Sequence, residues 1–290
     1  MTYHLIIGDR TYSSWSLRGW LLFEKFGIAR KSTVLNFMDG PIVGQLAGLG
    51  VAPARTLPTV ILPDGTIISE SLAITEELAQ RHPDAGILPS DPAMRALARN
   101  LAAEMATGFH ALRGFCPMNL RLAYTGVEPT DDVLADLRRI ETIWTHALEK
   151  SGGPWLCGTY SAADVFFAPV AMRIAGYGLS VNEAAQNYVD QHLSEPSFRQ
   201  WRAMALASGD SPDRYAQDYN RTTWPGPAPL KAIPADSGPS ENTTCPYSGD
   251  PVTDFMEMDG RTFGFCNPFC RDKTVNDPEA WPAFMAIYQS

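Results

Sequence analysis

Three serines in one short stretch are the first residues whose types and spacing indicate chemistry: Ser13, Ser14 and Ser16. Before them, residues 3–7 are apolar and β-prone, which is typical of a strand; after them, residues 17–26 have the apolar spacing of a helix. The serines therefore lie where a strand passes into a helix N-terminus. Unpaired backbone amides and the positive end of the helix dipole favour an anion there. A serine hydroxyl in this position can stabilise a thiolate, or it can simply cap the helix.

Three cysteines near the C-terminus form the second group. Cys245, Cys266 and Cys270 have the spacing Cys-x20-Cys-x3-Cys. An Asp-Gly pair between two β-prone runs predicts a hairpin that brings Cys245 alongside Cys266, and a helix beginning at Pro268 turns Cys270 toward both. Three thiolates at about 2.3 Å can then bind one metal ion. The alternative is three reduced cysteines in a small hydrophobic core.

An α/β pattern in residues 1–82 must position the serines. The pattern predicts strands and helices in the order β-α-β-loop-β-β-α, with strands at 3–7, 31–35, 57–62 and 66–68 and helices at 17–26 and 72–81. This is the order of a thioredoxin-like domain. Residues 36–56 are rich in Gly and Pro, so we expect a loop there with at most one short helix.

Helical periodicity dominates residues 93–208 after a proline-containing connection. We expect an all-helical domain there, with helices at 93–124, 130–150, 162–177, 181–193 and 196–207. Within it, Ser161 and Asp164 have the spacing of a capping box. Residues 209–244 are rich in Pro, Gly and Ser and read as a linker, and residues 245–290 read as a small separate cysteine-containing hairpin and helix module.

Composition narrows the functional class. The chain has 290 residues and a formal net charge of −9, which argues against nucleic acid or an anionic membrane surface as a partner. We find no secretory leader and no apolar run near the roughly 20 residues that span a bilayer, so we expect a cytoplasmic protein. In that reducing compartment, clustered cysteines favour metal or redox chemistry over structural disulfides.

Together, these motifs resemble the glutathione S-transferase family over residues 3–207. The resemblance rests on Tyr-Ser-Ser-Trp-Ser-Leu-Arg at 12–18, Leu-Pro at 57–58, Glu-Ser at 70–71 and Gly-Thr-Tyr-Ser-Ala-Ala-Asp at 158–164. The serine-rich turn is most similar to the zeta-type and related bacterial serine branches. The resemblance implies a homodimeric enzyme that activates the thiolate of its co-substrate glutathione for attack on a small electrophile.

Several site residues follow from this resemblance. Ser13 matches the serine usually assigned the catalytic role, and Ser14 is next in line. The resemblance also implies a cis peptide at Pro58, a backbone contact from Leu57 to the glutathione cysteine, and binding of the γ-glutamyl end at positions 70 and 71. For Glu70 and Ser71, helix capping is the alternative.

Trp15 and Arg173 are assigned to the pocket for the electrophile. Trp15 stands where the serine branches carry a cysteine that is implicated in their isomerase chemistry, so isomerase activity is expected only if it does not need that cysteine. Trp15 can instead fill a domain interface, and Arg173, on an otherwise apolar helix, can instead form a structural ion pair. For Arg18 we expect a salt bridge at the surface or between domains.

The last 46 residues, 245–290, resemble the YHS/TRASH-type metal-binding modules in their cysteine spacing and Asp-Pro ending. Ser248 stands where a Cys-x2-Cys version has a second cysteine. This resemblance implies zinc or another thiophilic metal, with the fourth ligand open between Asp250, Asp272, water and a thiol. The alternative function for the whole chain is a non-catalytic metal-handling or metal-sensing protein built on a transferase-like fold.

Overall fold

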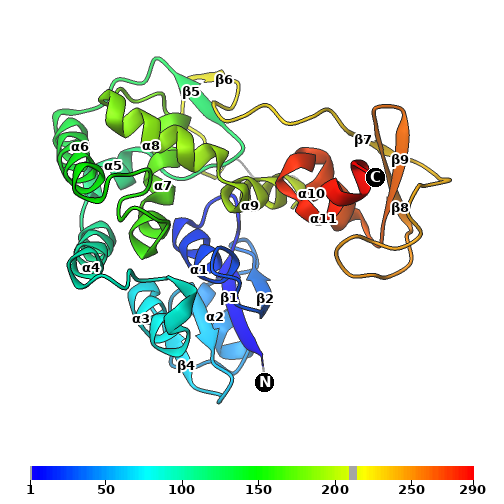
Figure 1. The fold of residues 1–290 in the computed structure, drawn as a ribbon, viewed down its shortest axis with the longest axis horizontal. Helices are drawn as coiled ribbons and strands as arrows, with labels where there is room; N and C mark the ends of the chain where they lie inside the picture. The colour runs from blue at the N-terminus through cyan, green and yellow to red at the C-terminus, as the bar shows by residue number, and fades with distance from the viewer. Residues whose placement is uncertain (1, 209–213) are drawn as a thin grey trace. The chain divides into compact units, whose positions relative to one another are not determined.

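The structure is a computed structural model that describes residues 2–208 and 214–290 (Figure 1). Within these residues the chain forms two compact units. The N-terminal unit comprises the described part of Met1–His192 together with Tyr215–Pro225. The C-terminal unit comprises the described part of Leu193–Arg214 together with Gly226–Ser290.

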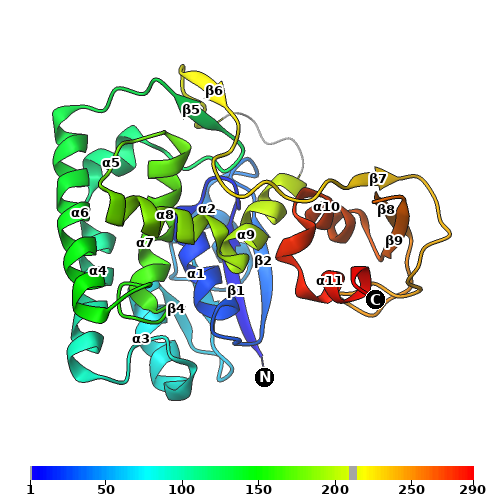
Figure 2. The same ribbon diagram turned by 45° about the horizontal axis from the view of Figure 1, so that its top comes forward.

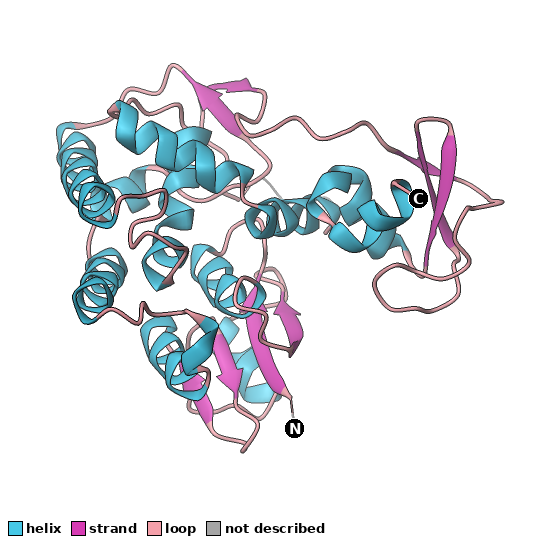
Figure 3. Cartoon of the chain, in the orientation of Figure 1, coloured by secondary structure: helices cyan, strands magenta, loops and turns pink. Residues whose placement is uncertain are grey.

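A four-stranded sheet anchors the first third of the N-terminal unit. Its strand order is β2-β1-β3-β4, where β1 is Tyr3–Gly8, β2 is Arg30–Leu35, β3 is Thr59–Ile61 and β4 is Ile67–Ser69. β1 and β2 are parallel because helix α1 (Ser14–Glu24) crosses between them, whereas β3 and β4 return antiparallel. Figure 3 shows this mixed sheet with its helices. It confirms the predicted thioredoxin-like arrangement.

Alternation along β1 buries both faces of this sheet. Leu5 faces α1, since a Cβ added at Gly19 of that helix would lie 3.6 Å from the Leu5 side chain. Ile6 faces the other way and packs in one core with Leu46 of α2 (Ile42–Gly48). Helix α3 (Ser71–Arg81) contacts α1. Helix α1 is therefore held by packing along much of its length, which fixes the position of its N-terminus.

Within the described residues, five further helices belong to the N-terminal unit (Figure 2), and one of them is buried along nearly its whole length. They are α4 (Pro92–Thr107), α5 (His110–Phe115), α6 (Asp131–Ser151), α7 (Ala162–Gly176) and α8 (Glu183–Ser194), with a short 3-10 turn at Pro83–Ala85. Nearly every residue of α7 is buried, and the predicted capping box of Ser161 and Asp164 starts it. Because α7 contacts both α1 and α4, it fixes side chains opposite the α1 N-terminus.

The single helix expected over residues 93–124 was wrong. The helix breaks at Gly108, whose backbone is extended and where a Cβ would lie 2.8 Å from the Glu104 carbonyl oxygen. Phe109 then adopts a left-handed conformation before α5 begins. Farther on, β5 (Ala123–Thr125) pairs antiparallel with β6 (Asn220–Thr222), so part of the expected linker belongs to this unit.

The C-terminal unit is larger than the module predicted from the cysteines. It contains α9 (Pro196–Ala207), a sheet β7-β8-β9 (Ile233–Ala235, Asp254–Met258 and Arg261–Phe265), α10 (Pro268–Asn276), a 3-10 turn at Pro278–Ala280 and α11 (Pro282–Tyr288). The predicted Asp-Gly hairpin turn joins β8 to β9, with both residues at positive φ. Pro278 and Pro282 each stand at the start of their element, the 3-10 turn and α11.

Helix α9, which we grouped with the helical domain, packs on α10 in this unit. Arg199 of α9 forms a two-pronged ion pair with Asp277, with N–O distances of 2.8 and 2.6 Å. The expected linker 209–244 also contributes β7 here, while its residues 209–213 lie outside the described part of the chain. No helix among the described residues is both long and apolar enough to cross a bilayer.

Candidate functional site

A cavity of about 450 Å³ opens at the N-terminus of α1. It is lined by the start of α1, by α5 and the segment after it, by α7, and by Tyr215. Four of the predicted site residues meet there: Ser13, Ser14, Trp15 and Arg173. These come from two elements more than 150 positions apart, which the packing of α7 on α1 brings together.

Ser13 caps α1. Its oxygen accepts a hydrogen bond from the Ser16 amide at 3.2 Å, and its hydroxyl donates to the Ser16 hydroxyl oxygen at 2.7 Å. That oxygen in turn accepts from the Gly8 amide at 2.8 Å. Ser16 is fully buried, and our site prediction omitted it. Its spacing of three residues from the cap was the available signal.

Ser14 and Arg173 meet across the cavity. The guanidinium donates from Nη2 to Ser14 Oγ at 3.5 Å, from Nε to the Cys116 carbonyl at 2.8 Å and from Nη1 to the Pro169 carbonyl at 3.1 Å. Burial, followed by the nearby Arg113, lowers the pKa of Arg173 to about 10, so the group stays charged at neutral pH. Among the described residues no carboxylate pairs with it, which excludes the structural ion pair considered as the alternative.

Trp15 lies between two more arginines. The Arg18 guanidinium carbon is 4.2 Å from the centre of the indole and that of Arg113 is 5.1 Å away. Arg18 is only 1% exposed and donates to the Phe166 carbonyl at 3.2 Å. The salt bridge expected for it, at the surface or between domains, is therefore not formed in the described chain. Burial and the two neighbouring arginines lower the pKa of Arg18.

This cavity is therefore strongly electropositive. Arg113 and Arg173 line it and Arg18 lies behind it against Trp15, and within the described chain none of the three forms an ion pair with a carboxylate. Sequence analysis missed Arg113 because it follows an unpredicted helix break. Unpaired buried cations are costly, so such a cavity favours an anionic ligand.

The predicted glutathione residues Leu57 and Pro58 lie against α1. Their peptide bond is cis, as the family resemblance implied. A Cβ added at Gly19 would lie 2.6 Å from Pro58 Cβ, so only glycine lets helix and proline approach this closely. The Leu57 side chain comes near Gly8, which ends β1. This segment therefore adjoins the serine turn.

Glu70 and Ser71 begin α3. Glu70 has φ of 76°, an uncommon value for a residue with a side chain. Its carboxylate accepts from Thr56 Oγ1 at 2.9 Å and makes no capping bond, so helix capping by this side chain is not observed. Ser71 is buried at the first helical position. Strained backbone of this kind often marks a ligand site.

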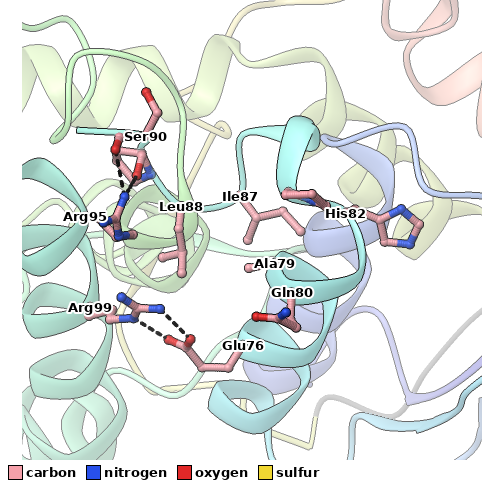
Figure 4. A pocket seen from close by; sticks show the side chains of 11 residues that line it. Glu76, Ala79, Gln80, His82, Ile87, Leu88, Ser90, Arg95 and Arg99 are labelled. Carbon is pink, nitrogen blue, oxygen red and sulfur yellow. Dashed lines mark hydrogen bonds and ion pairs between the residues drawn. The ribbon is translucent and has the colours of Figure 1, made fainter. Parts of the chain in front are cut away.

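A second pocket, of about 280 Å³, lies between α3 and α4 (Figure 4). Its two arginines already have partners within the lining. Arg99 forms a two-pronged pair with Glu76, both distances being 2.9 Å, and Arg95 donates to the Pro89 and Ser90 carbonyls. We therefore place the chemistry at the α1 cavity.

In the C-terminal unit, the sulfurs of Cys245, Cys266 and Cys270 all lie within 4.8 Å of one another. Burial opposes ionisation of Cys245, yet the amides of Tyr247, Cys266 and Ser248 donate to its sulfur, and the net effect lowers its pKa to about 7. A buried thiolate with amide donors and two thiol neighbours is a donor set that fits a thiophilic metal ion.

Comparison with known proteins agrees with this architecture. The family description "Glutathione S-transferase, N-terminal domain" matches residues 12–81. A probable maleylacetoacetate isomerase of Caenorhabditis elegans is 41% identical over 155 residues, which are 51% of this chain and 70% of that protein. The maleylacetoacetate isomerase of Pseudomonas aeruginosa is 32% identical over 201 residues, 66% of this chain and 91% of that protein.

Solved structures show the same fold at lower identity. A glutathione transferase homologue from Burkholderia, solved with bound glutathione, has a TM-score of 0.55 at 21% identity, over 71% of this chain and 98% of that chain. Glutathione transferase Omega 1C from Trametes versicolor has a TM-score of 0.55 at 19% identity, over 69% and 90%. With a matching N-terminal domain and a relative matched over nearly its whole length, this chain belongs to the glutathione S-transferase family of enzymes.

Proposed function

We propose that the N-terminal unit activates the thiol of glutathione for reaction with a small electrophile that carries a carboxylate. The observation that carries this proposal is the juxtaposition of the Ser13-capped α1 N-terminus with the buried Arg173, whose guanidinium has no carboxylate partner in the described chain. The first feature suits a thiolate and the second suits a carboxylate.

Ser13 is the proposed thiolate donor. When the Ser16 hydroxyl turns to donate to Ser13 Oγ, a chain from the Gly8 amide through Ser16 to Ser13 ends on the thiolate. A hydrogen bond to a charged group contributes about 1.5–3 kcal/mol and the helix terminus about 0.3–1 kcal/mol. Their sum matches the roughly 2.7 kcal/mol needed to lower a thiol pKa from about 8.5 to about 6.5.

The remaining glutathione contacts are assigned to the segments that adjoin α1 and begin α3. Leu57 would bind the cysteinyl backbone of glutathione through its own backbone, next to Pro58. Glu70 and Ser71 would hold the γ-glutamyl end, where the α3 N-terminus favours its carboxylate. The packing of Pro58 against Gly19 supports a fixed distance between these contacts and Ser13.

Arg173 and Trp15 are assigned to the electrophile. Relatives of this chain are named maleylacetoacetate isomerases, which agrees with an anionic substrate. Thiolate addition to a conjugated double bond gives an enolate. Bond rotation followed by loss of the thiolate would give isomerisation, whereas protonation of the enolate carbon by water would give the transfer product. Trp15, whose indole ring contacts the guanidinium groups of Arg18 and Arg113, would form the wall of the pocket beside the reacting bond.

A matched pair of substrates tests this assignment. Arg173→Gln should lower kcat/KM by about 10–100-fold for an electrophile with a carboxylate, the range for losing one charged hydrogen bond, and much less for its neutral ester. Arg95→Gln, which removes an arginine bonded only to carbonyls in the second pocket, serves as the control. An equal loss for both substrates would show that Arg173 does not recognise the carboxylate.

We propose metal binding as a second function, located in the C-terminal unit. Cys245, Cys266 and Cys270 would hold one zinc or other thiophilic ion, and their mutual approach within 4.8 Å supports this. If bound glutathione shows no thiolate while the cysteines hold metal, metal handling or sensing becomes the main function. Metal analysis of the purified protein and of its three Cys→Ser variants tests the site directly.

We further propose that the enzyme works as a homodimer in the cytoplasm, as the family resemblance implies. Light scattering that gives a mass near the 31.8 kDa monomer across micromolar concentrations would contradict the dimer.

A further inference from the structure

We infer that Ser248 is the fourth ligand of the metal ion proposed for Cys245, Cys266 and Cys270, so that the centre has three sulfurs and one hydroxyl oxygen. The inference rests on the metal site proposed above. Neither the cysteine spacing nor the list of expected fourth ligands included this serine.

The distances around Cys266 match a tetrahedral centre. With zinc–sulfur bonds of about 2.3 Å and zinc–oxygen bonds of about 2.0 Å, two sulfurs are about 3.8 Å apart, and a sulfur and an oxygen about 3.5 Å. In the structure, Cys266 Sγ is 3.9 Å from Cys270 Sγ and accepts a hydrogen bond from the Ser248 hydroxyl at 3.3 Å, a bond that metal binding to the oxygen lone pair would replace. The serine oxygen therefore lies one tetrahedral edge from a ligand sulfur.

A tight turn holds Ser248 in this place. The Cys245 amide donates to the Asp250 carbonyl at 2.8 Å, and the Gly249 amide donates to the Cys245 carbonyl at 2.9 Å, with Gly249 at φ of 78°. The Asp250 amide also donates to Ser248 Oγ at 3.2 Å. Cys245 and Ser248 are thus the two ends of one turn, spaced as the pair of ligands in a Cys-x2-Cys loop.

The carboxylates considered for the fourth position are placed elsewhere. Asp272 accepts from Arg271 Nε at 2.7 Å, and Asp250 serves the turn through its backbone. In the described residues neither carboxylate lies within the 4.8 Å group that the three sulfurs form. Asn267 donates its amide to Cys266 Sγ at 3.1 Å, which makes it an outer partner of that thiolate.

Charge and ligand type favour a divalent ion of zinc character. Three thiolates, a neutral hydroxyl and a divalent ion leave a net charge of −1. Lys273, one turn after Cys270 on α10, is largely buried with its ammonium 3.6 Å from the Tyr247 ring centre and 3.9 Å from that of Trp281. The same ligands would leave −2 around Cu(I), a charge that costs more in a partly buried site, and a hydroxyl ligand also suits zinc better than Cu(I).

Cobalt substitution of the full-length protein tests the inference. Co(II) should give the parent a tetrahedral spectrum with charge-transfer bands from three thiolates. Ser248→Cys should raise those bands by about one third, since four thiolates replace three. Ser248→Ala should weaken Zn(II) affinity by about tenfold or more, whereas Asp272→Asn, the matched carboxylate control, should leave spectrum and affinity unchanged.

The outcomes separate this inference from the metal proposal itself. A parent protein that binds neither Co(II) nor Zn(II) would overturn the metal site. Metal binding with unchanged affinity in Ser248→Ala would overturn only the role of Ser248, even if Ser248→Cys adds a thiolate band, because a cysteine there can bind the ion where a serine does not. Calorimetry of each variant checks that the C-terminal unit is folded, since a folded unit keeps its thermal transition.

Discussion

At the residue scale, the site depends on side chains whose hydrogen bonds are arranged before a ligand binds. Ser13 and Arg173 could be predicted because a serine before an apolar run and an arginine on an apolar helix are local signals. Ser16 also had a local signal, its spacing of three residues from Ser13, which our site prediction did not use. Arg113 had none, because its place in the cavity depends on where α5 begins, which local sequence does not determine.

A buried histidine gives a pH prediction at the same scale. His192 is 1% exposed, neither ring nitrogen has a partner in the described chain, and burial lowers its pKa to about 3 from the ordinary 6.5. Between about pH 3 and pH 6.5, the unfolded chain therefore binds a proton at His192 that the folded chain does not bind. The contribution of His192 to the free energy of unfolding is fully present above about pH 6.5. It is lost as pH falls toward 3, by up to about 1.4 kcal/mol per pH unit.

His192→Phe, which preserves a ring among Trp155, Tyr160 and Tyr188, should therefore show a shallower loss of stability between about pH 6.5 and pH 4. Urea unfolding across that range measures it. Burial raises the pKa of Asp164 to about 6, so its contribution falls as pH rises toward 6, but it is common to both proteins and cancels. Identical pH slopes would exclude a neutral buried histidine.

At the element scale, periodicity predicted the order of strands and helices along residues 1–82 and most of the later helices, because each element is encoded within its own residues. The long helix expected at 93–124 was the exception. The break at Gly108 and the pairing of β5 with β6 escaped prediction. β5 and β6 have three residues each and lie almost 100 positions apart, so their pairing carries no local signal. Two glycines have a structural reason: Gly108 ends a helix and Gly19 lets α1 pack on Pro58. At each position an added Cβ would collide with a neighbouring atom.

Gly19→Ala tests whether close packing of α1 on Pro58 positions the glutathione segment. Alanine should stabilise a helix interior by about 1 kcal/mol, but here its Cβ would lie 2.6 Å from Pro58. We expect a net loss of about 1–3 kcal/mol and weaker glutathione binding. Gly44→Ala in α2, where a Cβ meets nothing within 4 Å, is the control and should be neutral or stabilising. Equal effects at both glycines would contradict the packing argument.

At the scale of the whole molecule, composition identified a change near residue 209 but not how the chain packs around it. Helix α9 looked like one more helix of the preceding domain, yet its partners are α10 and Asp277 in the C-terminal unit. A proline-rich segment signals an interruption of helices, and it does not reveal that β6 and β7 pair with strands in different units.

Removing metal should therefore affect one unit selectively. Because metal binding energy becomes folding energy in a small cysteine module, a chelator should lower the midpoint of one thermal transition and leave the affinity for glutathione unchanged. Calorimetry with and without chelator, together with glutathione titration, measures both quantities. A chelator that abolishes glutathione binding would contradict independent sites.

Thiolate activation at the α1 N-terminus is tested most directly by an ultraviolet titration of glutathione bound to the enzyme, because the absorbance of the thiolate increases as pH rises. We predict a bound-thiol pKa of about 6.5 in the parent and a return toward about 8.5 in Ser13→Ala. Thr130→Ala, which removes the serine-like cap of α6 far from the cavity, should leave the thiol pKa at the parent value. A thiol pKa near 8.5 in the parent, or one that Ser13→Ala does not change, would contradict thiolate activation by the α1 N-terminus.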